Sequence, residues 1–285
     1  MTIRQQLQHW SIAGPAQKHF MRQHAIDPAV LARNAAFRGT HRGERCFIVG
    51  NGPSVKEQDL SLLADEQVFS MNYAYKMEHF AQMRPNFHLY MDGSCFDEEL
   101  HKPADFTDVL QKADNPVCFL PYLPAKQYVE RHPEMEALRP YYLFPYYAFT
   151  GFDMGFPVHG ELEEGISNFY TVVQYAILIA VYMGFAEIYL LGCDCTGILT
   201  DLAVMQQQSE VGGYAYDFDE EDQRRLKAFY ETHIHLEDTF FGWANIFKGY
   251  RYVGAYCAQH GVKLLNATRT TALDTVPRVR YESLF

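Results

Sequence analysis

The stretch Cys46-Phe47-Ile48-Val49-Gly50-Asn51-Gly52-Pro53-Ser54 decides the fold class, because an apolar run breaks there into a glycine-rich turn. The run predicts a buried strand, and the Pro-Ser pair suits the first turn of a helix, with the serine as its cap. Glycines let the backbone approach a ligand, and unpaired N–H groups at a helix start attract an anion. We therefore expect this turn to bind a phosphate through Gly50, Asn51, Gly52, Pro53 and Ser54.

The spacing of this turn matches neither of the two common nucleotide fingerprints. Both G-x-G-x-x-G and G-x-x-x-x-G-K-[ST] require glycines at other positions, so the usual NAD or ATP sites are not implied. The simpler alternative is an ordinary strand-to-helix turn without a ligand.

Apolar runs that favour strands alternate with helical patterns along the rest of the chain. This alternation predicts an α/β fold, a Rossmann-like and mostly parallel sheet with helices on both faces. The predicted strands are 45–50, 67–71, 86–91, 116–120, 187–192 and 262–266.

Polar residues follow most of these predicted strands. Ligands of parallel sheets lie beyond the carboxyl ends of the strands, so these residues are candidates for the same site. A single Asn or Asp at such a place is more often a turn or cap residue, but a set in register with the glycine-rich turn favours a ligand. The candidates are Asn51, Asn72, Asp92, Asp194 and Asn266.

The charge is distributed unevenly. The 285 residues carry a formal charge of −11, whereas residues 1–45 hold seven Lys or Arg against two Asp or Glu. An acidic body excludes general nucleic-acid binding. We expect residues 1–44 to form a helical basic arm and residues 45–285 the catalytic domain. The arm is a candidate for peripheral contact with an anionic membrane or for a partner helix; a solvated appendage is the alternative.

No signal-peptide pattern opens the chain, and the longest apolar stretch, 172–183, is too short to span a membrane, so a cytoplasmic location is expected. The six cysteines lack the paired spacing of a zinc site and are expected to be reduced core residues. No metal site is predicted. An Asp-x-Asp at Asp217 and Asp219 has the pattern that holds Mg²⁺ or Mn²⁺ in many nucleotide-sugar transferases, but its acidic surroundings favour a solvated helix start.

Two long segments interrupt the alternation. Residues 121–165 are rich in tyrosine and proline, and residues 196–220 are polar with glycines. Long connections of this kind are commonly lids or binding loops, and we expect a lid over about 196–242. A tyrosine-rich packing surface or homo-oligomer interface is the alternative for 141–147.

In this order and spacing, the motifs resemble the bacterial sialyltransferases of glycosyltransferase family 42. They resemble more closely a set of bacterial surface-polysaccharide proteins labelled 6-hydroxymethylpterin diphosphokinase-like. The resemblance covers the chain from about residue 45. It rests on the glycine-rich turn, Asn72, Asp92, and the segments 182–194, 214–217, 266–268 and 277–281.

The sialyltransferase resemblance implies a GT-A-like variant of the Rossmann fold that binds a CMP-activated sugar. Asn51 and Asn72 match family residues that bind the donor, whereas Asp92 stands where the family has an amide. Two lid tyrosines of the family stabilise the departing phosphate. Tyr214 matches the second, Thr196 replaces the first, and Tyr216 is the candidate substitute.

The family's general base is a lid histidine, for which His235 and His233 are the candidates. The resemblance favours His235 because of its spacing to the Phe-Phe-Gly run at 240–242. An unperturbed imidazole pKa of ~6.5 suits removal of a proton from a hydroxyl. A half-exposed structural histidine is the alternative for either position.

These features lead to one expected activity and two rivals. The expected activity is an inverting, metal-independent glycosyltransferase that moves an acidic sugar, sialic acid-like or Kdo-like. The donor would be a CMP ester, with no further cofactor, and the acceptor a hydroxyl of a surface glycan of capsule or lipopolysaccharide, for which a lipid-linked glycan is a candidate. The first rival is a Mg²⁺-dependent diphosphokinase with a pterin-like substrate. The second is a non-catalytic protein that binds a nucleotide or glycan.

Overall fold

A computed structural model describes residues 14–96, 103–146, 158–206, 210–233 and 235–285. Eight strands form one sheet in the order β6-β5-β4-β3-β2-β1-β7-β8, and every neighbouring pair is parallel. This confirms the predicted α/β class. The strands are β1 (Arg45–Val49), β2 (Gln67–Met71), β3 (Phe87–Leu89), β4 (Val117–Pro121), β5 (Tyr141–Tyr146), β6 (Gly165–Ser167), β7 (Glu187–Leu191) and β8 (Lys263–Asn266).

The six strands predicted from the sequence are present, but β5 and β6 were missed. Strand β5 lies inside 121–165, the segment expected to be a lid or binding loop, and β6 begins at its last residue. The tyrosines at 142 and 146 are buried, which agrees with the alternative of a tyrosine-rich packing surface, and α5 (Tyr122–Arg131) precedes β5. The expectation of one long connection there was wrong, because tyrosine and proline are compatible with a strand whose faces are covered.

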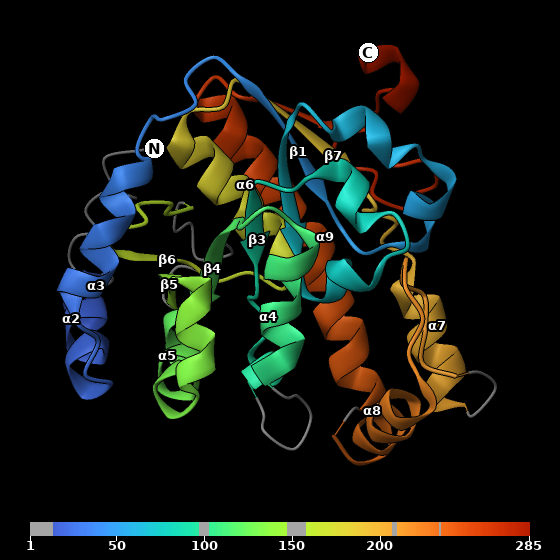
Figure 1. Ribbon diagram of the computed structural model, residues 1–285, viewed down its shortest axis with the longest axis horizontal. Coiled ribbons are helices and arrows are strands. Elements are labelled where there is room, and N and C mark those ends of the chain that lie inside the picture. The colour runs from blue at the N-terminus through green and yellow to red at the C-terminus, as the bar shows by residue number, and fades with distance from the viewer. Residues whose placement is uncertain (1–13, 97–102, 147–157, 207–209, 234) are drawn as a thin grey trace.

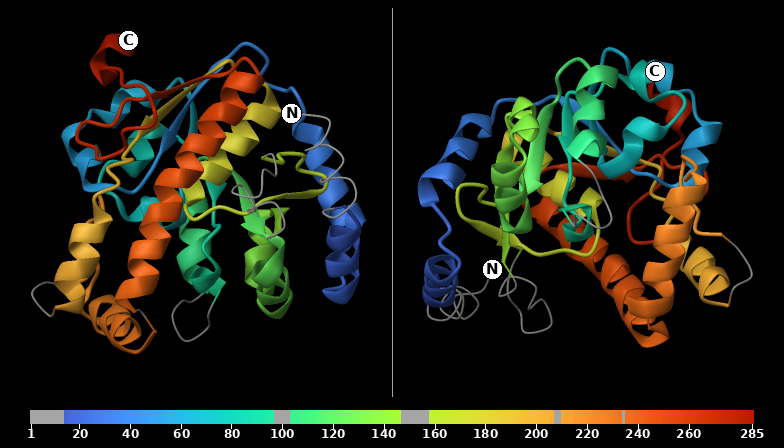
Figure 2. Two further views of the ribbon diagram at one scale, coloured as in Figure 1. Left: turned by 180° about the vertical axis from the view of Figure 1, so that it is seen from behind. Right: turned by 60° about the horizontal axis from the view of Figure 1, so that its bottom comes forward.

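Helices cover both faces of the sheet (Figures 1 and 2). Side chains alternate along β1, so that Phe47 and Val49 pack on one face and Cys46 and Ile48 on the other. The first face carries α3, α4 (Pro103–Lys112) and α5. The second carries α6 (Val172–Met183) and α9 (Leu236–Gln259). Helix α6 is apolar almost all round and nearly every residue is buried, so it is a core helix.

Residues of the basic arm pack against the body. Its described part contains α2 (Gly14–Gln23), α3 (Pro28–Ala32) and the 3₁₀ turn η2 (Arg33–Phe37). The buried Asn34 amide donates to the carbonyls of Tyr142 and Leu162, at 2.8 and 2.7 Å. Arg38 pairs with Glu161 and Glu163. Residues 1–13, including the apolar positions that suggested membrane contact, lie outside the described residues.

The remaining elements are short 3₁₀ turns near the strand ends and the helices of the predicted lid. Helix α7 (Gly197–Met205) and helix α8 (Glu220–His233) precede α9 at one side of the sheet (Figure 1). None of the helices in the described ranges has the length and apolarity needed to cross a bilayer. The 3₁₀ turns are η3 (Pro53–Glu57), η4 (Leu60–Leu63), η5 (Asn72–Lys76), η6 (Phe80–Met83), η7 (Gly93–Phe96), η8 (Pro133–Leu138) and η11 (Tyr281–Leu284).

Strand order places the binding site. The chain builds the sheet outward from β1 to β6 and then returns to add β7 on the free side of β1. The connections therefore diverge between β1 and β7, and a crevice opens beyond the carboxyl ends of strands at such a switch point.

Candidate active site

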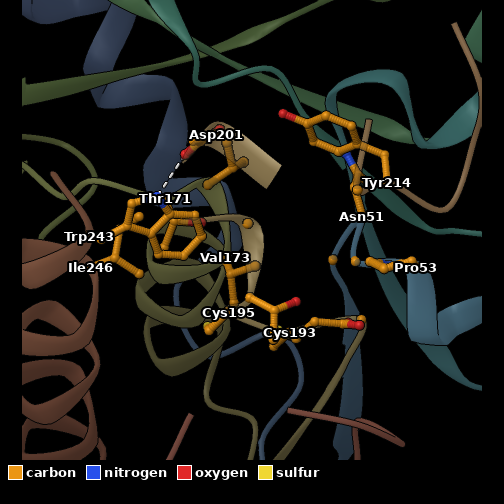
Figure 3. A pocket seen from close by; sticks show the side chains of 18 of the residues that line it. Asn51, Pro53, Thr171, Val173, Cys193, Cys195, Asp201, Tyr214, Trp243 and Ile246 are labelled. Atoms are coloured by element: carbon orange, nitrogen blue, oxygen red, sulfur yellow. Dashed lines mark hydrogen bonds between the residues drawn. The ribbon is translucent and has the colours of Figure 1, made fainter. Parts of the chain in front are cut away.

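A cavity of about 480 Å³ lies at this switch point. Its lining residues come from the turns after β1, β2 and β7, the start of α6, and the helices α7, α8 and α9 (Figure 3). Predicted site residues in the lining are Gly50, Asn51, Gly52, Pro53, Asn72, Asp194 and Tyr214. Ser54, Asp92, Tyr216, His235 and Asn266 are described in the structure but lie outside the lining.

The glycines of the first turn allow two backbones to cross. Gly52 N–H donates to the carbonyl of Gly192 at 2.9 Å, and Gly192 adopts a positive φ of 60°. A Cβ on Gly50 would lie 2.7 Å from that carbonyl oxygen, and one on Gly52 would lie 2.0 Å from Asp194 Oδ2. The turns after β1 and β7 can therefore meet only because these positions lack side chains.

The structure corrects the predicted role of Ser54. Its N–H and its hydroxyl both donate to the Asp194 carboxylate, at 3.0 and 2.8 Å. The cap residue of η3 is Gly52 rather than the serine, and Pro53 opens this turn as expected. Burial raises the pKa of Asp194, while the two bonds from Ser54 oppose that rise. An internal carboxylate thus occupies the place where the sequence predicted an external phosphate.

A different helix presents its N-terminus to the cavity. Thr171, Val172 and Val173, at the start of α6, line it, and no acidic side chain occupies the first turn of this helix. The first N–H groups of an α-helix have no partner inside the helix and carry partial positive charge. The Thr171 side chain makes no capping hydrogen bond to them. The sequence interpretation missed this helix start as a part of the cavity, and the Thr-Val-Val step from a loop into an apolar helix was the available signal.

Two residues of the lining, Asn51 and Asn72, each carry a buried amide oxygen without a hydrogen-bond partner among the described residues. Asn51 Nδ2 donates to the Met71 carbonyl at 3.2 Å, and the Asn51 backbone carbonyl accepts from Ala215 N–H at 2.8 Å. In the described part of the chain, no group donates to Oδ1 of Asn51 or Oδ1 of Asn72 with hydrogen-bond geometry. Buried polar atoms are nearly always paired, so each oxygen suits a hydroxyl or amino donor of a ligand once its side chain turns toward the cavity.

Asn72 is held in a strained conformation by a buried histidine. Its φ is 46°, in the left-handed region. His88 Nε2 donates to the Asn72 carbonyl at 3.0 Å, because a carbonyl can only accept, and Nδ1 therefore accepts from the Ser70 hydroxyl at 2.7 Å. Burial lowers the pKa of His88 to about 3, so the imidazole is neutral.

The two candidate tyrosines differ in access to the cavity. Tyr214 lines it, and its ring stacks on that of Tyr216 with centroids 5.4 Å apart. Burial of the phenol raises the pKa of Tyr214 to about 12, and the Asp201 and Asp92 carboxylates add to this rise. The Tyr214 hydroxyl is thus a neutral hydrogen-bond donor at neutral pH. Tyr216 is buried behind it.

His235, the favoured candidate for the general base, does not line the cavity. His235 is exposed and precedes α9, where its carbonyl accepts from the N–H of Thr239 at 3.0 Å. Thr239 itself lines the cavity, so His235 lies one helical turn from the lining. His233 is the last residue of α8, and its side chain is outside the described part.

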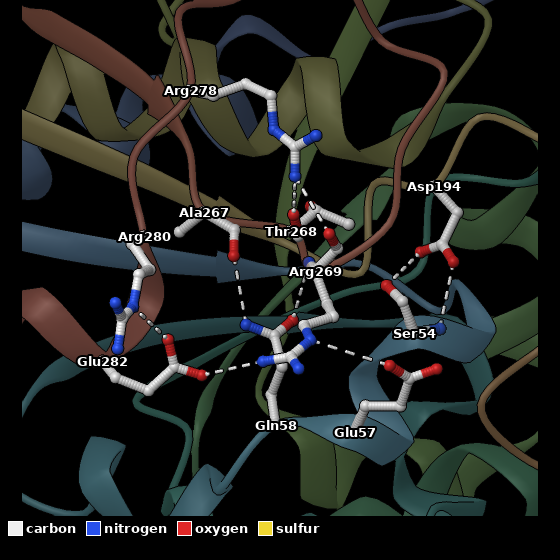
Figure 4. Close-up of polar contacts among 10 residues, drawn as sticks. All are labelled: Ser54, Glu57, Gln58, Asp194, Ala267, Thr268, Arg269, Arg278, Arg280 and Glu282. Carbon is white, nitrogen blue, oxygen red and sulfur yellow. Dashed lines mark hydrogen bonds and ion pairs between the residues drawn. The ribbon is translucent and has the colours of Figure 1, made fainter.

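Asn266 and the C-terminal segment belong to one structural network, in which Figure 4 shows Arg278 beside Thr268 and Arg269. The buried Asn266 Oδ1 accepts from Thr268 N–H at 3.0 Å. Arg278 Nη2 donates to the carbonyls of Thr268 and Arg269, at 2.8 and 2.9 Å. Asn266 therefore shapes this segment and contributes nothing to the cavity lining, contrary to its expected role in donor binding.

The sequence interpretation also missed the wall made by the lid helices. Asp201 of α7 lines the cavity and accepts from Tyr230 and Trp243, as Figure 3 shows for the tryptophan. Asp238 lines it from the first turn of α9. Trp243, one of the two tryptophans in the chain, was the sequence feature that could have indicated this wall.

Other expectations concern metals and thiols. All six cysteines are free, and five are buried. Asp219 accepts from Asp222 N–H at 2.8 Å, which makes it the cap of α8, and the Asp217 side chain is 94% exposed. The interpretation of this Asp-x-Asp as a helix start is confirmed. Within the described ranges, no three His, Cys, Asp or Glu side chains gather as metal ligands would.

A family described as 6-hydroxymethylpterin diphosphokinase MptE-like matches residues 24–197. The chain belongs to this family. The resemblance to diphosphokinase-like proteins is thereby confirmed, although the match of this MptE-like chain begins inside the basic arm rather than near residue 45. A search of curated proteins gave no match.

Solved structures with a similar arrangement include sialyltransferases of Campylobacter jejuni. CstII in complex with cytidine-5'-monophosphate is 19% identical over 83% of this chain and 85% of its own, with a TM-score of 0.46. The monofunctional alpha-2,3-sialyltransferase Cst-I is 15% identical over 83% of this chain and 80% of its own, with a TM-score of 0.48.

Proposed function

We propose that this MptE-like protein is a glycosyltransferase that moves an acidic sugar, sialic acid-like or Kdo-like, from a CMP-activated donor to a hydroxyl of a surface glycan. The observation that carries the proposal is the joint presence of the α6 N-terminus and two unpartnered amide oxygens in one cavity. The helix start suits a single phosphate, and amide oxygens suit the hydroxyls of a ribose or a sugar.

The charge of the lining supports a donor with few phosphates. Among the described residues that line the cavity, none is Lys, Arg or His. A CMP ester carries one phosphate charge, which backbone N–H groups and a phenol can stabilise. The neutral Tyr214 hydroxyl is the candidate donor to the phosphate oxygen as the sugar leaves.

The proposed chemistry is a direct displacement with inversion. The acceptor oxygen forms a bond to the anomeric carbon, the bond from that carbon to the phosphate oxygen breaks, and CMP departs with the electron pair. We assign removal of the acceptor proton to His235, which needs a movement of the start of α9 toward the cavity, with His233 as the second candidate. The proposed mechanism uses no metal. The proposal includes peripheral contact of the basic arm, residues 1–44, with a membrane that carries the acceptor.

The family description favours a second candidate function. A diphosphokinase acting on a pterin-like substrate would transfer diphosphate from ATP and require Mg²⁺ to neutralise the triphosphate. A non-catalytic nucleotide-binding protein is the third candidate, and it differs from both enzymes by lacking turnover.

One binding panel separates these functions. Purified full-length protein is titrated calorimetrically with CMP, CDP, UDP, GDP and ATP, each with EDTA and with Mg²⁺. We expect selective CMP binding that survives EDTA. Asn51→Ala should weaken it about tenfold, because it deletes a buried hydrogen-bonding amide. Gln82→Ala, an exposed amide outside the cavity, is the matched control.

Turnover completes the test. We expect release of CMP from CMP-sialic acid or CMP-Kdo when a glycan acceptor is present, and loss of that release in His235→Ala. Mg²⁺-dependent ATP binding without CMP binding would reject the transferase in favour of the diphosphokinase. CMP binding without release of CMP from either donor, in the wild type as in His235→Ala and His233→Ala, would favour the non-catalytic protein.

A further inference from the structure

The cavity has two chemically different walls. Asn51, Pro53 and the glycines form one wall, and Figure 3 shows Asp201, Trp243 and Ile246 on the opposite side. We call Asp201, Tyr230, Asp238 and Trp243 the carboxylate wall. Its members come from α7, α8 and α9 and all line the cavity.

Asp201 is oriented before any ligand binds. Tyr230 Oη donates to its Oδ1 at 2.8 Å, and Trp243 Nε1 donates to its Oδ2 at 2.8 Å. A carboxylate has about four acceptor positions, so two remain for a ligand. Two donors fixed on separate oxygens hold the plane of the group, and such preorganisation lowers the entropy lost on binding. This geometry suits a pair of neighbouring hydroxyls.

Trp243 adds an aromatic surface beside that carboxylate. A Cβ on Gly197 would lie 2.7 Å from Cζ2 of the indole, so the glycine lets the start of α7 pack directly on the ring. The indole is only partly buried and lines the cavity. Indole rings combine a large apolar face with a polar edge, and few converging polar groups orient a ligand in such a pocket. A pyranose, with apolar C–H faces and hydroxyl edges, matches both.

Charge then restricts which sugar binds there. Asp201 and Asp238 face the cavity, and no cation is found among its described lining residues. A second anion at this wall would be repelled with little screening. The start of α6 lines the same cavity and carries partial positive charge without an acidic side chain in its first turn, which favours the anionic donor at that helix start.

From these contacts we infer that the carboxylate wall is the acceptor subsite, and that it takes an uncharged pyranose with adjacent hydroxyls while rejecting anionic sugars. This inference rests on the proposed function, because it assigns the second substrate of the same cavity. Asp201 binds the hydroxyls, and Trp243 stacks on the ring.

The test compares two probes on CMP-saturated full-length protein. Lactose ends in a neutral hexose and 3′-sialyllactose in an anionic sugar, and saturation-transfer NMR titrations give both affinities. We expect lactose to bind at least tenfold more tightly. Asp201→Asn should weaken lactose about tenfold and narrow the preference between the probes, because the variant removes charge and keeps the shape. A merely structural loss would weaken both probes equally.

Controls keep the outcome decisive. Asp65→Asn, an exposed aspartate outside the cavity, should change neither affinity. If Asp201→Asn does not fold, Asp238→Asn serves instead. Because Asp238 is exposed, this substitution should narrow the preference for lactose over 3′-sialyllactose without disturbing the core. Equal binding of both probes, preference for sialyllactose, binding of neither, or an unchanged preference in the folded variants would overturn the inference.

The two proposals fail in distinguishable ways. If CMP does not bind but lactose still binds selectively in its absence, the donor is wrong and the carboxylate wall stands. If CMP binds through Asn51 and lactose shows no preference, only the acceptor subsite is wrong.

Discussion

Replacement of His88 is the perturbation with the most direct consequence for the cavity. The imidazole is fully buried and neutral, donates to the carbonyl of Asn72 and accepts from Ser70. His88→Leu would leave that carbonyl and that hydroxyl without this partner, which costs about 1–3 kcal/mol of unfolding free energy. His88→Gln places an amide N–H near the former Nε2 and should retain most of the stability.

The pH dependence gives a sharper magnitude. The pKa of His88 is about 3 in the folded chain against an ordinary value of 6.5. Because the folded pKa is the lower one, the unfolded chain binds the proton first as the pH falls. The contribution of the neutral His88 to the free energy of unfolding is therefore complete above pH 6.5 and is lost progressively toward pH 3. Between pH 7.5 and pH 5 the loss from this residue is about 2 kcal/mol.

The assay is urea unfolding of wild type and His88→Gln at both pH values. Other groups titrate in both proteins, so the difference between their unfolding free energies isolates the histidine. We expect wild type to lose about 2 kcal/mol relative to His88→Gln on going from pH 7.5 to pH 5. If the difference in unfolding free energy between wild type and His88→Gln is the same at both pH values, the assignment of a buried neutral imidazole is refuted. We also expect His88→Leu to weaken CMP binding about tenfold more than His88→Gln, because only leucine releases Asn72.

Three further substitutions test the turn after β1 and the C-terminal segment. Gly52→Ala should weaken CMP binding at least tenfold in calorimetry, because its Cβ would lie 2.6 Å from a backbone oxygen, whereas Gly254→Ala has open space and should bind CMP normally. Ser54→Ala should lower the unfolding free energy by about 1–3 kcal/mol and raise the pKa of Asp194 further, which urea unfolding and carboxyl NMR titration would measure; an unchanged Asp194 pKa would contradict the contact. Arg278→Ala should expose the C-terminal segment to limited proteolysis at native pH, while equal cleavage rates would show that its two carbonyl contacts do not hold that segment.

The strands that could be predicted are those whose burial is evident from a continuous apolar run in the sequence. Runs such as 46–49 and 188–191 are apolar throughout, as strands covered on both faces must be. Strand β5 has the sequence Tyr-Tyr-Leu-Phe-Pro-Tyr, and its burial depends on α3 and α5 packing beside it. No local pattern records that packing, which is why the segment was interpreted as a lid or loop, with a packing surface or an interface as the alternatives for 141–147.

The site shows the same division. Asn51 and Asn72 could be predicted because each comes within two residues of the end of a strand, and parallel strands end at one edge. Ser54, in the turn after β1, and Asn266, at the end of β8, lie at the same edge, yet internal partners take their polar groups. A strand-end residue is available to a ligand only where no internal group occupies its polar atoms. Asp194, which accepts from Ser54, lies 140 residues away in the sequence.

The sequence by itself determined the parallel α/β sheet, the glycine-rich crossing and the two amides, because strand periodicity and backbone freedom are local properties. Only the tertiary structure decided which helix start meets the cavity, since the start of α6 becomes a cavity wall through its packing against β1 and β2. The carboxylate wall likewise exists only after α7, α8 and α9 converge on Asp201. Orientation of a charge by two distant donors is a property of the folded chain, and no spacing in the sequence encodes it.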